Sequence, residues 1–170
     1  MSKPEDQVRQ LLDIHQIQQL LLKYAIALDS RQLDLMDRLF TKDAKIDLAG
    51  TGVFSVTDYK KMAGGVLPGL EATQHFCSPA VIRIEGDQAF SRCYFMAQHA
   101  RNSLAPQPFI MVAGHYDDEL VRANDGWLIA KRTGTATWVD GNPAVLGYPI
   151  PPGGLPWLES RNCPAWLLKS

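Results

Sequence analysis

The apolar positions of this chain follow a helical repeat at the start and a strand-like alternation in the second half. Between Pro4 and Leu28 they recur every three or four residues, which predicts one amphipathic helix. This stripe consists of Val8, Leu11, Leu12, Ile14, Ile17, Leu21, Tyr24 and Leu28. Shorter elements are predicted next: a helix over 33–40, strands over 44–48 and 53–55, and a helix that begins at Thr57.

Residues 74–101 are predicted to form a β-hairpin with a histidine near each outer end. Gly86-Asp87 provides the turn, because this pair suits a backbone with positive φ. His75 and His99 each share a strand face with mainly apolar residues, so both are expected to point inwards. An imidazole on such a face is either a satisfied core residue or a working acid–base group.

The register of this hairpin decides whether the two histidines face each other. A two-residue loop places His75 opposite Gln98. A three-residue loop, or a bulge near Pro79, shifts the pairing by one and places His75 opposite His99. Pro79 cannot donate to the ladder, so a bulge or a strand end there is compatible with the sequence, and both registers remain open.

Two more long strands, 109–121 and 127–139, are predicted after the hairpin, with a turn at 124–126. Helices followed by a run of strands indicate an α+β fold rather than a βαβ alternation. A strongly bent antiparallel sheet wrapped around the first helix would form a cone with an apolar interior. Inward side chains of such a sheet line a cavity, which is a usual place for a small-molecule ligand.

The whole chain, residues 1–170, has the length of a single domain. The core of this domain is predicted to span about residues 7–140. Residues 141–170 are rich in Pro and Gly but include Trp157 and Trp166, which make the segment too apolar for a free linker. This C-terminal extension is therefore expected to pack on the domain, on a neighbouring subunit or across the mouth of a pocket.

The composition of the chain narrows the classes of function. A net charge of −1 gives no basic surface, which argues against nucleic-acid binding. Three cysteines without a C-x-x-C pair favour reduced thiols in the cytoplasm over a disulfide framework or a structural zinc site. The charged N-terminus lacks a signal-peptide pattern, and no apolar run is long enough to span a membrane.

Asp29 and His75 are the main candidates for chemistry. A carboxylate that binds one imidazole nitrogen fixes the tautomer and raises the basicity of the other nitrogen. A histidine supported in this way is suited to remove a proton from a carbon beside a carbonyl group at neutral pH. The alternatives are an ion pair of Asp29 with Arg31, and a core histidine at position 75 that is hydrogen-bonded to the backbone.

Three further residues are candidates for the same site. His99 could polarise a substrate carbonyl or protonate a leaving hydroxyl, or it could be a buried partner of a backbone carbonyl. Tyr24 could donate to an oxyanion, although it lies about 140° around the helix from Asp29, and such tyrosines are often core residues. Arg132 could stabilise an enolate or a departing anion, or form an internal ion pair with the acidic residues at 117–119.

The sequence indicates no cofactor and no metal site. It contains no phosphate loop, dinucleotide fingerprint or Gly-x-Ser-x-Gly elbow. His115 could complete a three-histidine metal site with His75 and His99, but nothing in the sequence specifies one.

Several segments together resemble the SnoaL-like branch of the nuclear transport factor 2-like superfamily, whose fold is a cone-shaped α+β barrel. These segments are Tyr24–Arg31, Leu39–Ala44, Thr73–His75, Gly114–Leu120, Asp125–Trp127 and Lys131-Arg132. The resemblance covers about residues 7 to 154 and is fairly specific for the fold. It is not specific for the activity, because this superfamily contains dehydratases, isomerases, cyclases and binding modules.

Within this branch the chain looks most similar to lyases that use no cofactor, namely scytalone dehydratase, bile acid 7α-dehydratase and hexachlorocyclohexane dehydrochlorinase. The site residues that the resemblance implies are the dyad Asp29 and His75, together with Tyr24, His99 and Arg132. One departure concerns the substrate. Scytalone dehydratase has a tyrosine directly before its aspartate, whereas Leu28 stands here, which argues against scytalone itself.

The function implied by the resemblance is a cofactor-independent dehydration of an apolar alicyclic, steroid-like or polyketide-like hydroxy compound. One alternative is an isomerase or polyketide cyclase that uses the same base without losing water. The other is a module that only binds a small molecule. The family also implies a homo-oligomer, either a trimer or a dimer.

Overall fold

The computed structural model describes residues 3–48, 51–124, 126–147 and 163–168. Its helical elements, in which η marks a 3-10 helix, are α1 (Pro4–Asp29), η1 (Leu33–Arg38), α2 (Val56–Val66), η2 (Leu67–Gly69), η3 (Asn102–Leu104), η4 (Pro143–Leu146) and η5 (Ala165–Leu168). Its strands are β1 (Phe40–Leu48), β2 (Gly52–Ser55), β3 (Ala72–Cys77), β4 (Val81–Glu85), β5 (Gln88–Ala100), β6 (Phe109–Ala123) and β7 (Gly126–Gly141). Among these residues, no helix has the length and apolar character needed to cross a membrane.

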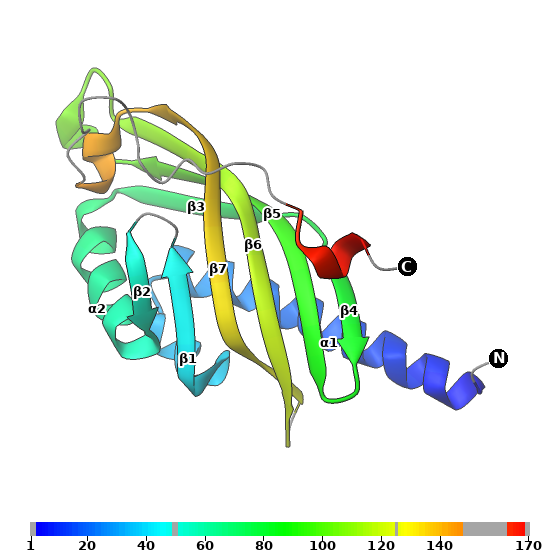
Figure 1. Cartoon of the computed structure of the whole chain (residues 1–170). Helices are drawn as coiled ribbons and strands as arrows, with labels where there is room; N and C mark the ends of the chain where they lie inside the picture. Colours follow the sequence, from blue (N-terminus) through cyan, green and yellow to red (C-terminus); the bar gives the residue numbers. More distant parts are fainter. Residues whose placement is uncertain (1–2, 49–50, 125, 148–162, 169–170) are drawn as a thin grey trace.

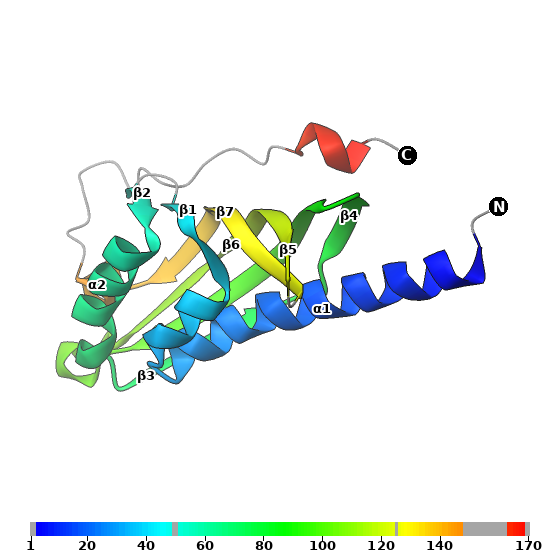
Figure 2. The same cartoon turned by 90° about the horizontal axis from the view of Figure 1, so that it is seen from below.

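The strands form one curved sheet in the order β2-β1-β7-β6-β5-β3, and β4 also pairs with β5. Figure 1 shows the sheet bending across the molecule with α1 behind it, and Figure 2 shows α1 lying along its inner face. The α+β fold expected from the sequence is confirmed, with a sheet that does not close on itself. One pairing differs from an all-antiparallel sheet, because β1 runs parallel to β7.

Only the C-terminal part of α1 contributes its apolar stripe to the core. Ile17, Tyr24 and Leu28 are buried, whereas Val8 and Leu11 in the first turns are exposed. Figure 2 shows the reason, since the N-terminal turns of α1 extend beyond the edge of the sheet. The same stripe therefore has two environments: it packs in the core near the C-terminal end of the helix and is exposed near the N-terminal end.

The predicted hairpin is interrupted in its first arm. The two-residue turn at Gly86-Asp87 pairs Glu85 with Gln88, as predicted for the shorter loop. Residues 78–80 separate β3 from β4, and Pro79, which has no N–H to donate, lies in this break. Between the paired segments the first arm has one residue more than β5, which is the kind of bulge expected near Pro79.

This extra residue shifts β3 by one position, but in the direction opposite to the one expected. His75 pairs with Ala97, and Thr73 pairs with His99. Both predicted registers, His75 opposite Gln98 and His75 opposite His99, are therefore wrong. An extra residue in the first arm makes each residue of β3 pair with a residue of β5 one position closer to the turn. For His75 to pair with His99, the extra residue would have to lie in the second arm. The two histidines become diagonal neighbours on one face of the sheet.

The C-terminal extension is described at its two ends, residues 141–147 and 163–168. At the first end Val145 of η4 is fully buried in the core. The ring of Trp166 stacks on Phe90 of β5, with 6.2 Å between the ring centroids. Its carbonyl oxygen accepts a hydrogen bond of 3.3 Å from Arg83 of β4. Residues 148–162, which include Trp157, lie outside the described residues. The packing of the extension as a whole therefore stays a prediction.

Candidate functional site

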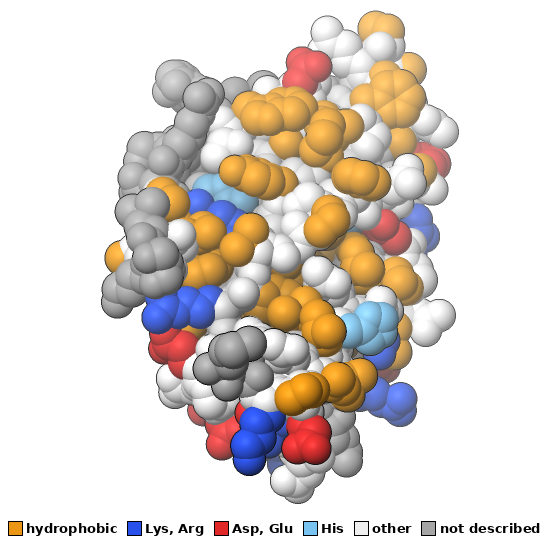
Figure 3. All heavy atoms as spheres, turned by 90° about the vertical axis from the view of Figure 1, so that its right-hand side faces the viewer, with side chains coloured by type: hydrophobic (Ala, Val, Ile, Leu, Met, Phe, Trp, Pro, Cys, Tyr) orange, Lys and Arg blue, Asp and Glu red, His pale blue; other side chains and the backbone are white. Residues whose placement is uncertain are grey.

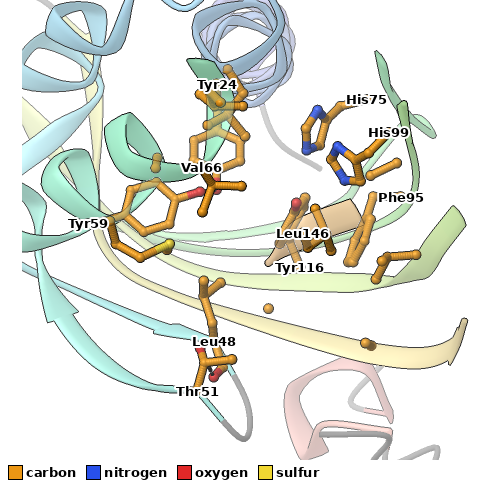
Figure 4. A pocket seen from close by; sticks show the side chains of 18 residues that line it. Tyr24, Leu48, Thr51, Tyr59, Val66, His75, Phe95, His99, Tyr116 and Leu146 are labelled. Atoms are coloured by element: carbon orange, nitrogen blue, oxygen red, sulfur yellow. Dashed lines mark hydrogen bonds between the residues drawn. The ribbon is translucent and has the colours of Figure 1, made fainter. Parts of the chain in front are cut away.

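A cavity of about 190 Å³ lies between α1, α2 and the inner face of the sheet. Most of its lining is apolar, and the polar side chains in it are those of Tyr24, Thr51, Tyr59, His75, His99 and Tyr116. Figure 4 shows His75 next to His99 on one wall of this cavity, with Tyr24 and Tyr59 on other walls. A concave apolar space with a few convergent polar groups is the usual form of a small-molecule site.

Asp29 and His75 form a hydrogen-bonded pair at the edge of this cavity. Asp29 is the last residue of α1, and His75 lies on the edge strand β3. The Nδ1 atom of His75 is 2.7 Å from Oδ1 of Asp29, and the backbone N–H of His75 donates to Oδ2, also at 2.7 Å. Two bonds from one residue fix the orientation of the carboxylate relative to the imidazole ring.

The electrostatics of this pair determine which nitrogen of His75 is available. Burial raises the pKa of Asp29, but the hydrogen bonds from His75 outweigh it, and the net pKa lies below its ordinary value. An ionised carboxylate only accepts hydrogen bonds, so Nδ1 of His75 carries the proton that points at Asp29. His75 itself lines the cavity, which leaves its Nε2 as the basic nitrogen for a ligand.

His99 lies beside His75, with the ring centroids 5.5 Å apart and the rings at 74° to each other. Its Nδ1 is 2.9 Å from the hydroxyl oxygen of Thr73. Burial, assisted by the nearby positive charge that His75 can carry, lowers the pKa of His99 to about 4. His99 is therefore neutral at physiological pH and offers a hydrogen-bonding nitrogen rather than a charge.

A group of tyrosines forms the deeper part of the cavity. The hydroxyl oxygens of Tyr24 on α1 and Tyr59 on α2 are 2.6 Å apart, and the ring of Tyr116 on β6 packs edge-on against Tyr24. Burial raises the pKa of all three phenols, so they stay protonated and can donate hydrogen bonds. The Tyr24 side chain thus both lines the cavity and has a partner for its hydroxyl.

Two of these tyrosines were not foreseen as site residues. Tyr59 lies in a segment whose only sequence signal was its helical character, and helical periodicity does not indicate contact with the end of another helix. Tyr116 lies within a segment that carried the family resemblance, and its alternation with His115 could have assigned it to the inner face.

Arg132 lies behind the cavity and is not among the residues that line it. It is fully buried, and its Nε and Nη2 atoms donate to the carboxylate of Asp118 at 2.7 and 2.8 Å. Its guanidinium carbon is 4.1 Å from the ring centroid of Tyr24 and 4.5 Å from that of Tyr116. The internal ion pair, one of the two alternatives for Arg132, is the arrangement present, and two phenol rings contact its guanidinium.

His115 does not join the other two histidines. It pairs with Tyr94 on the outer face of the sheet, while Tyr116, the next residue, points inwards. A site formed by His75, His99 and His115 is therefore excluded by the alternation of β6. Within the described ranges, no group of three or more His, Cys, Asp or Glu side chains is arranged to hold a metal ion.

Comparison with known proteins agrees with this fold and supplies the family. A family model described as SnoaL-like domain matches residues 9–133. An uncharacterised protein of Mycobacterium tuberculosis is 34% identical over 132 residues, which cover 75% of this chain and 88% of that protein.

Two solved structures illustrate the likeness in three dimensions. One, from Novosphingobium aromaticivorans and named as a proposed scytalone dehydratase, has a TM-score of 0.71 at 21% identity and covers 78% of this chain and 89% of its own. The other is the hexachlorocyclohexane dehydrochlorinase LinA-type3 from Novosphingobium barchaimii, with a TM-score of 0.71 at 18% identity, covering 86% and 99%. At these identities the two structures establish a shared fold.

Proposed function

Because this chain belongs to the family of SnoaL-like domains, we propose that its cavity is the active site of a cofactor-independent lyase, a dehydratase. The observation that carries the proposal is the Asp29–His75 pair at the edge of an apolar cavity. The names of the two structural neighbours, a dehydratase and a dehydrochlorinase, support an elimination reaction. Because the sequence identity to both neighbours is low, the proposed reaction depends mainly on the geometry of the site in this chain.

In the proposed reaction, Nε2 of His75 removes a proton from the carbon beside a substrate carbonyl group. Asp29 accepts the hydrogen bond of the resulting imidazolium and stabilises its charge. Electrons of the broken C–H bond form an enolate, which then expels the hydroxyl group on the neighbouring carbon. The departing oxygen takes a proton back from His75, or takes one from the hydrogen-bonded Tyr24–Tyr59 pair, and water leaves. In the second case the His75 imidazolium returns its proton to the phenolate, so that both groups end as they began.

Tyr24 and His99 are proposed to donate hydrogen bonds to the oxygen on which charge develops, because both line the cavity and both are neutral. Arg132 is proposed to act through the tyrosine rings it contacts rather than by touching the substrate. A cation against the face of a phenol favours the phenol as a hydrogen-bond donor, and its charge lowers the pKa that burial raises in Tyr24.

The cavity also suggests the size of the substrate. Apolar cavities of about 150 Å³ hold one benzene molecule, and the cavity here, of about 190 Å³, is slightly larger. We therefore favour a compact ring compound with a hydroxyl group β to a carbonyl over a large polycyclic one. Recognition would rest on the shape of the apolar wall, with orientation set by the few polar groups.

The test combines product mass with two variants. Compact cyclic β-hydroxy ketones are incubated with the protein, and products are followed by mass spectrometry for the loss of one water. Asp29→Asn and His75→Ala should each lower turnover by about 10²- to 10⁴-fold, the usual contribution of a general base, while ligand affinity is retained. His15→Ala, an exposed change on α1, is the matched control and should leave turnover unchanged.

The same experiment separates the two alternative functions. A product of unchanged mass whose formation depends on His75 would indicate an isomerase or cyclase. A protein that binds these compounds, with no product of either kind and equal affinity in the Asp29→Asn variant, would be a binding module and would contradict the proposal.

A further inference from the structure

Thr73 links the second histidine of the cavity to the Asp29–His75 pair. It lies directly opposite His99 in the β3–β5 ladder and two residues before His75, so the three side chains share one face of the sheet. Its hydroxyl oxygen is 2.9 Å from Nδ1 of His99 and 3.5 Å from Oδ1 of Asp29. One hydroxyl proton can serve only one of these two acceptors.

The position of this proton decides what His99 presents to a ligand. If Thr73 donates to Asp29, the Nδ1 of His99 must carry a proton and donate to Thr73, and Nε2 is left as an acceptor. If Thr73 donates to His99, Nδ1 is the acceptor and Nε2 carries the proton. Since Nδ1 is turned to Thr73 and His99 lines the cavity, Nε2 is the nitrogen available to a bound molecule.

The distances favour the second arrangement. A separation of 2.9 Å is an ordinary hydrogen bond, whereas the 3.5 Å to Asp29 is at the limit of one. Asp29 already accepts two bonds of 2.7 Å from His75 and gains little from a third, long one. An imidazole nitrogen is also a better acceptor than a hydroxyl oxygen, which favours the hydroxyl as the donor in the short contact.

We propose that Thr73 is a positioning residue, which donates its hydroxyl proton to Nδ1 of His99 and so holds that ring with its proton on Nε2. The tautomer of His99 is inferred from the geometry alone, whereas its role in catalysis rests on the proposed function. The cavity then contains two neighbouring imidazoles of opposite character, an acceptor at Nε2 of His75 and a donor at Nε2 of His99. A base beside a neutral donor is the pair needed to take a proton and to bind the enolate oxygen that forms.

The decisive measurement is the tautomer of His99 in the wild-type protein without any substrate. Nitrogen-15 NMR of the histidine rings at pH 7 separates protonated from unprotonated ring nitrogens. Glutamine variants of each of the four histidines assign the signals. The expected result is an unprotonated Nδ1 and a protonated Nε2 for His99. A proton on Nδ1, or equal populations of the two tautomers, would overturn the inference.

Two variants of Thr73 test the cause. Thr73→Val removes the hydroxyl at nearly constant shape and should lower the ratio of the Nε2–H to the Nδ1–H tautomer about fivefold, the value expected for one ordinary hydrogen bond. Thr73→Ser keeps the hydroxyl and should retain the wild-type ratio. An unchanged ratio in Thr73→Val would contradict the role of Thr73, and the wild-type spectrum decides the tautomer even if this variant does not fold.

The proposed tautomer of His99 and the proposed lyase activity can be refuted independently of each other. A wild-type protein with the expected tautomer but no turnover would refute the proposed lyase and leave the role of Thr73 intact. Where turnover is found, Thr73→Val should lower kcat with little change in KM, because the donor is needed most when charge develops on the substrate, and Thr73→Ser should restore it. A loss of kcat in both variants alike would point to a merely structural role.

Discussion

At the scale of single residues, the burial of His99 predicts a pH dependence of the free energy of unfolding, which can be measured without a substrate. Its pKa is about 4 in the folded protein, chiefly because of burial, while that of an unfolded histidine is about 6.5. Between these pH values the unfolded chain binds a proton that the folded chain does not. The free energy of unfolding should therefore fall as the pH is lowered from 6.5 to 4, by up to about 3 kcal/mol from this residue.

Urea unfolding of the wild type and of His99→Gln between pH 4 and 7 measures this contribution. In the variant, unfolding should take up as much as one proton fewer than in the wild type. A plot of its free energy of unfolding against pH should therefore have a smaller slope. His15→Gln, at an exposed position on α1, serves as the matched control and should keep the wild-type slope. Equal slopes for the wild type and His99→Gln would mean that His99 is not buried in its neutral form.

The residues of the site differ in how far the sequence could reveal them. Asp29 and His75 were predicted as a pair, mainly through the family resemblance, and they are hydrogen-bonded. The bond that the backbone N–H of His75 donates to Asp29, and the contact between Thr73 and His99, depend on the register of β3. That register is set by one inserted residue near Pro79, and a local sequence pattern does not tell which arm receives it.

At the scale of elements, α1 is held to the sheet by an unexpected carboxylate. Asp13 lies among the apolar residues of the first helix and is 7% exposed. It accepts two hydrogen bonds from Arg122 of β6, at 2.7 and 2.8 Å, and one of 3.0 Å from the indole N–H of Trp127 on β7. These bonds lower the pKa of Asp13, those from Arg122 most strongly. The helix is thus fastened where its apolar stripe leaves the core.

Removing this carboxylate should weaken the fold without touching the cavity. Asp13→Ala leaves the indole N–H and part of the Arg122 guanidinium without their partner, while Arg122 keeps its bond to Asp87. We expect the free energy of unfolding to fall by about 2 kcal/mol. Urea denaturation at pH 7 measures this value. Asp6→Asn, in the exposed first turn of the same helix, should change it by less than about 1 kcal/mol. A similar small effect for both variants would show that Asp13 does not anchor α1.

The elements themselves were predicted well where their period is long and unbroken. The bounds of α1, β6 and β7 differ from the sequence prediction by at most two residues at any end. The apolar stripe did not reveal that Val8 and Leu11 are exposed, because periodicity indicates the apolar face of a helix and not what covers that face. The parallel pairing of β1 with β7 was likewise not visible, since it joins segments far apart in the chain.

At the scale of the whole molecule, the outer face of the sheet carries a row of large apolar side chains. Phe76 of β3 is directly paired with Met96 of β5, and the small, buried Ala113 of β6 lies between Met96 and Trp138 of β7. Three of them remain well exposed: Phe76 by 69%, Met96 by 44% and Trp138 by 45%. Figure 3, seen from the right-hand side of Figure 1, shows that hydrophobic side chains also gather at the surface on that side of the molecule. Neighbouring exposed apolar side chains on one sheet face mark an interaction site when they form a contiguous patch.

We expect a second copy of the chain to cover this row, in line with the dimer or trimer predicted from the family resemblance. Size-exclusion chromatography with light scattering should give an oligomer for the wild type. The double variant Phe76→Lys, Trp138→Lys should shift the measured mass towards that of the monomer, because two charges would have to be buried in the interface. Val53→Lys is the control, since Val53 on β2 is 63% exposed but lies outside this row. A monomeric wild type at micromolar concentration, or an oligomer unaffected by the double variant, would show that the row is not an interface.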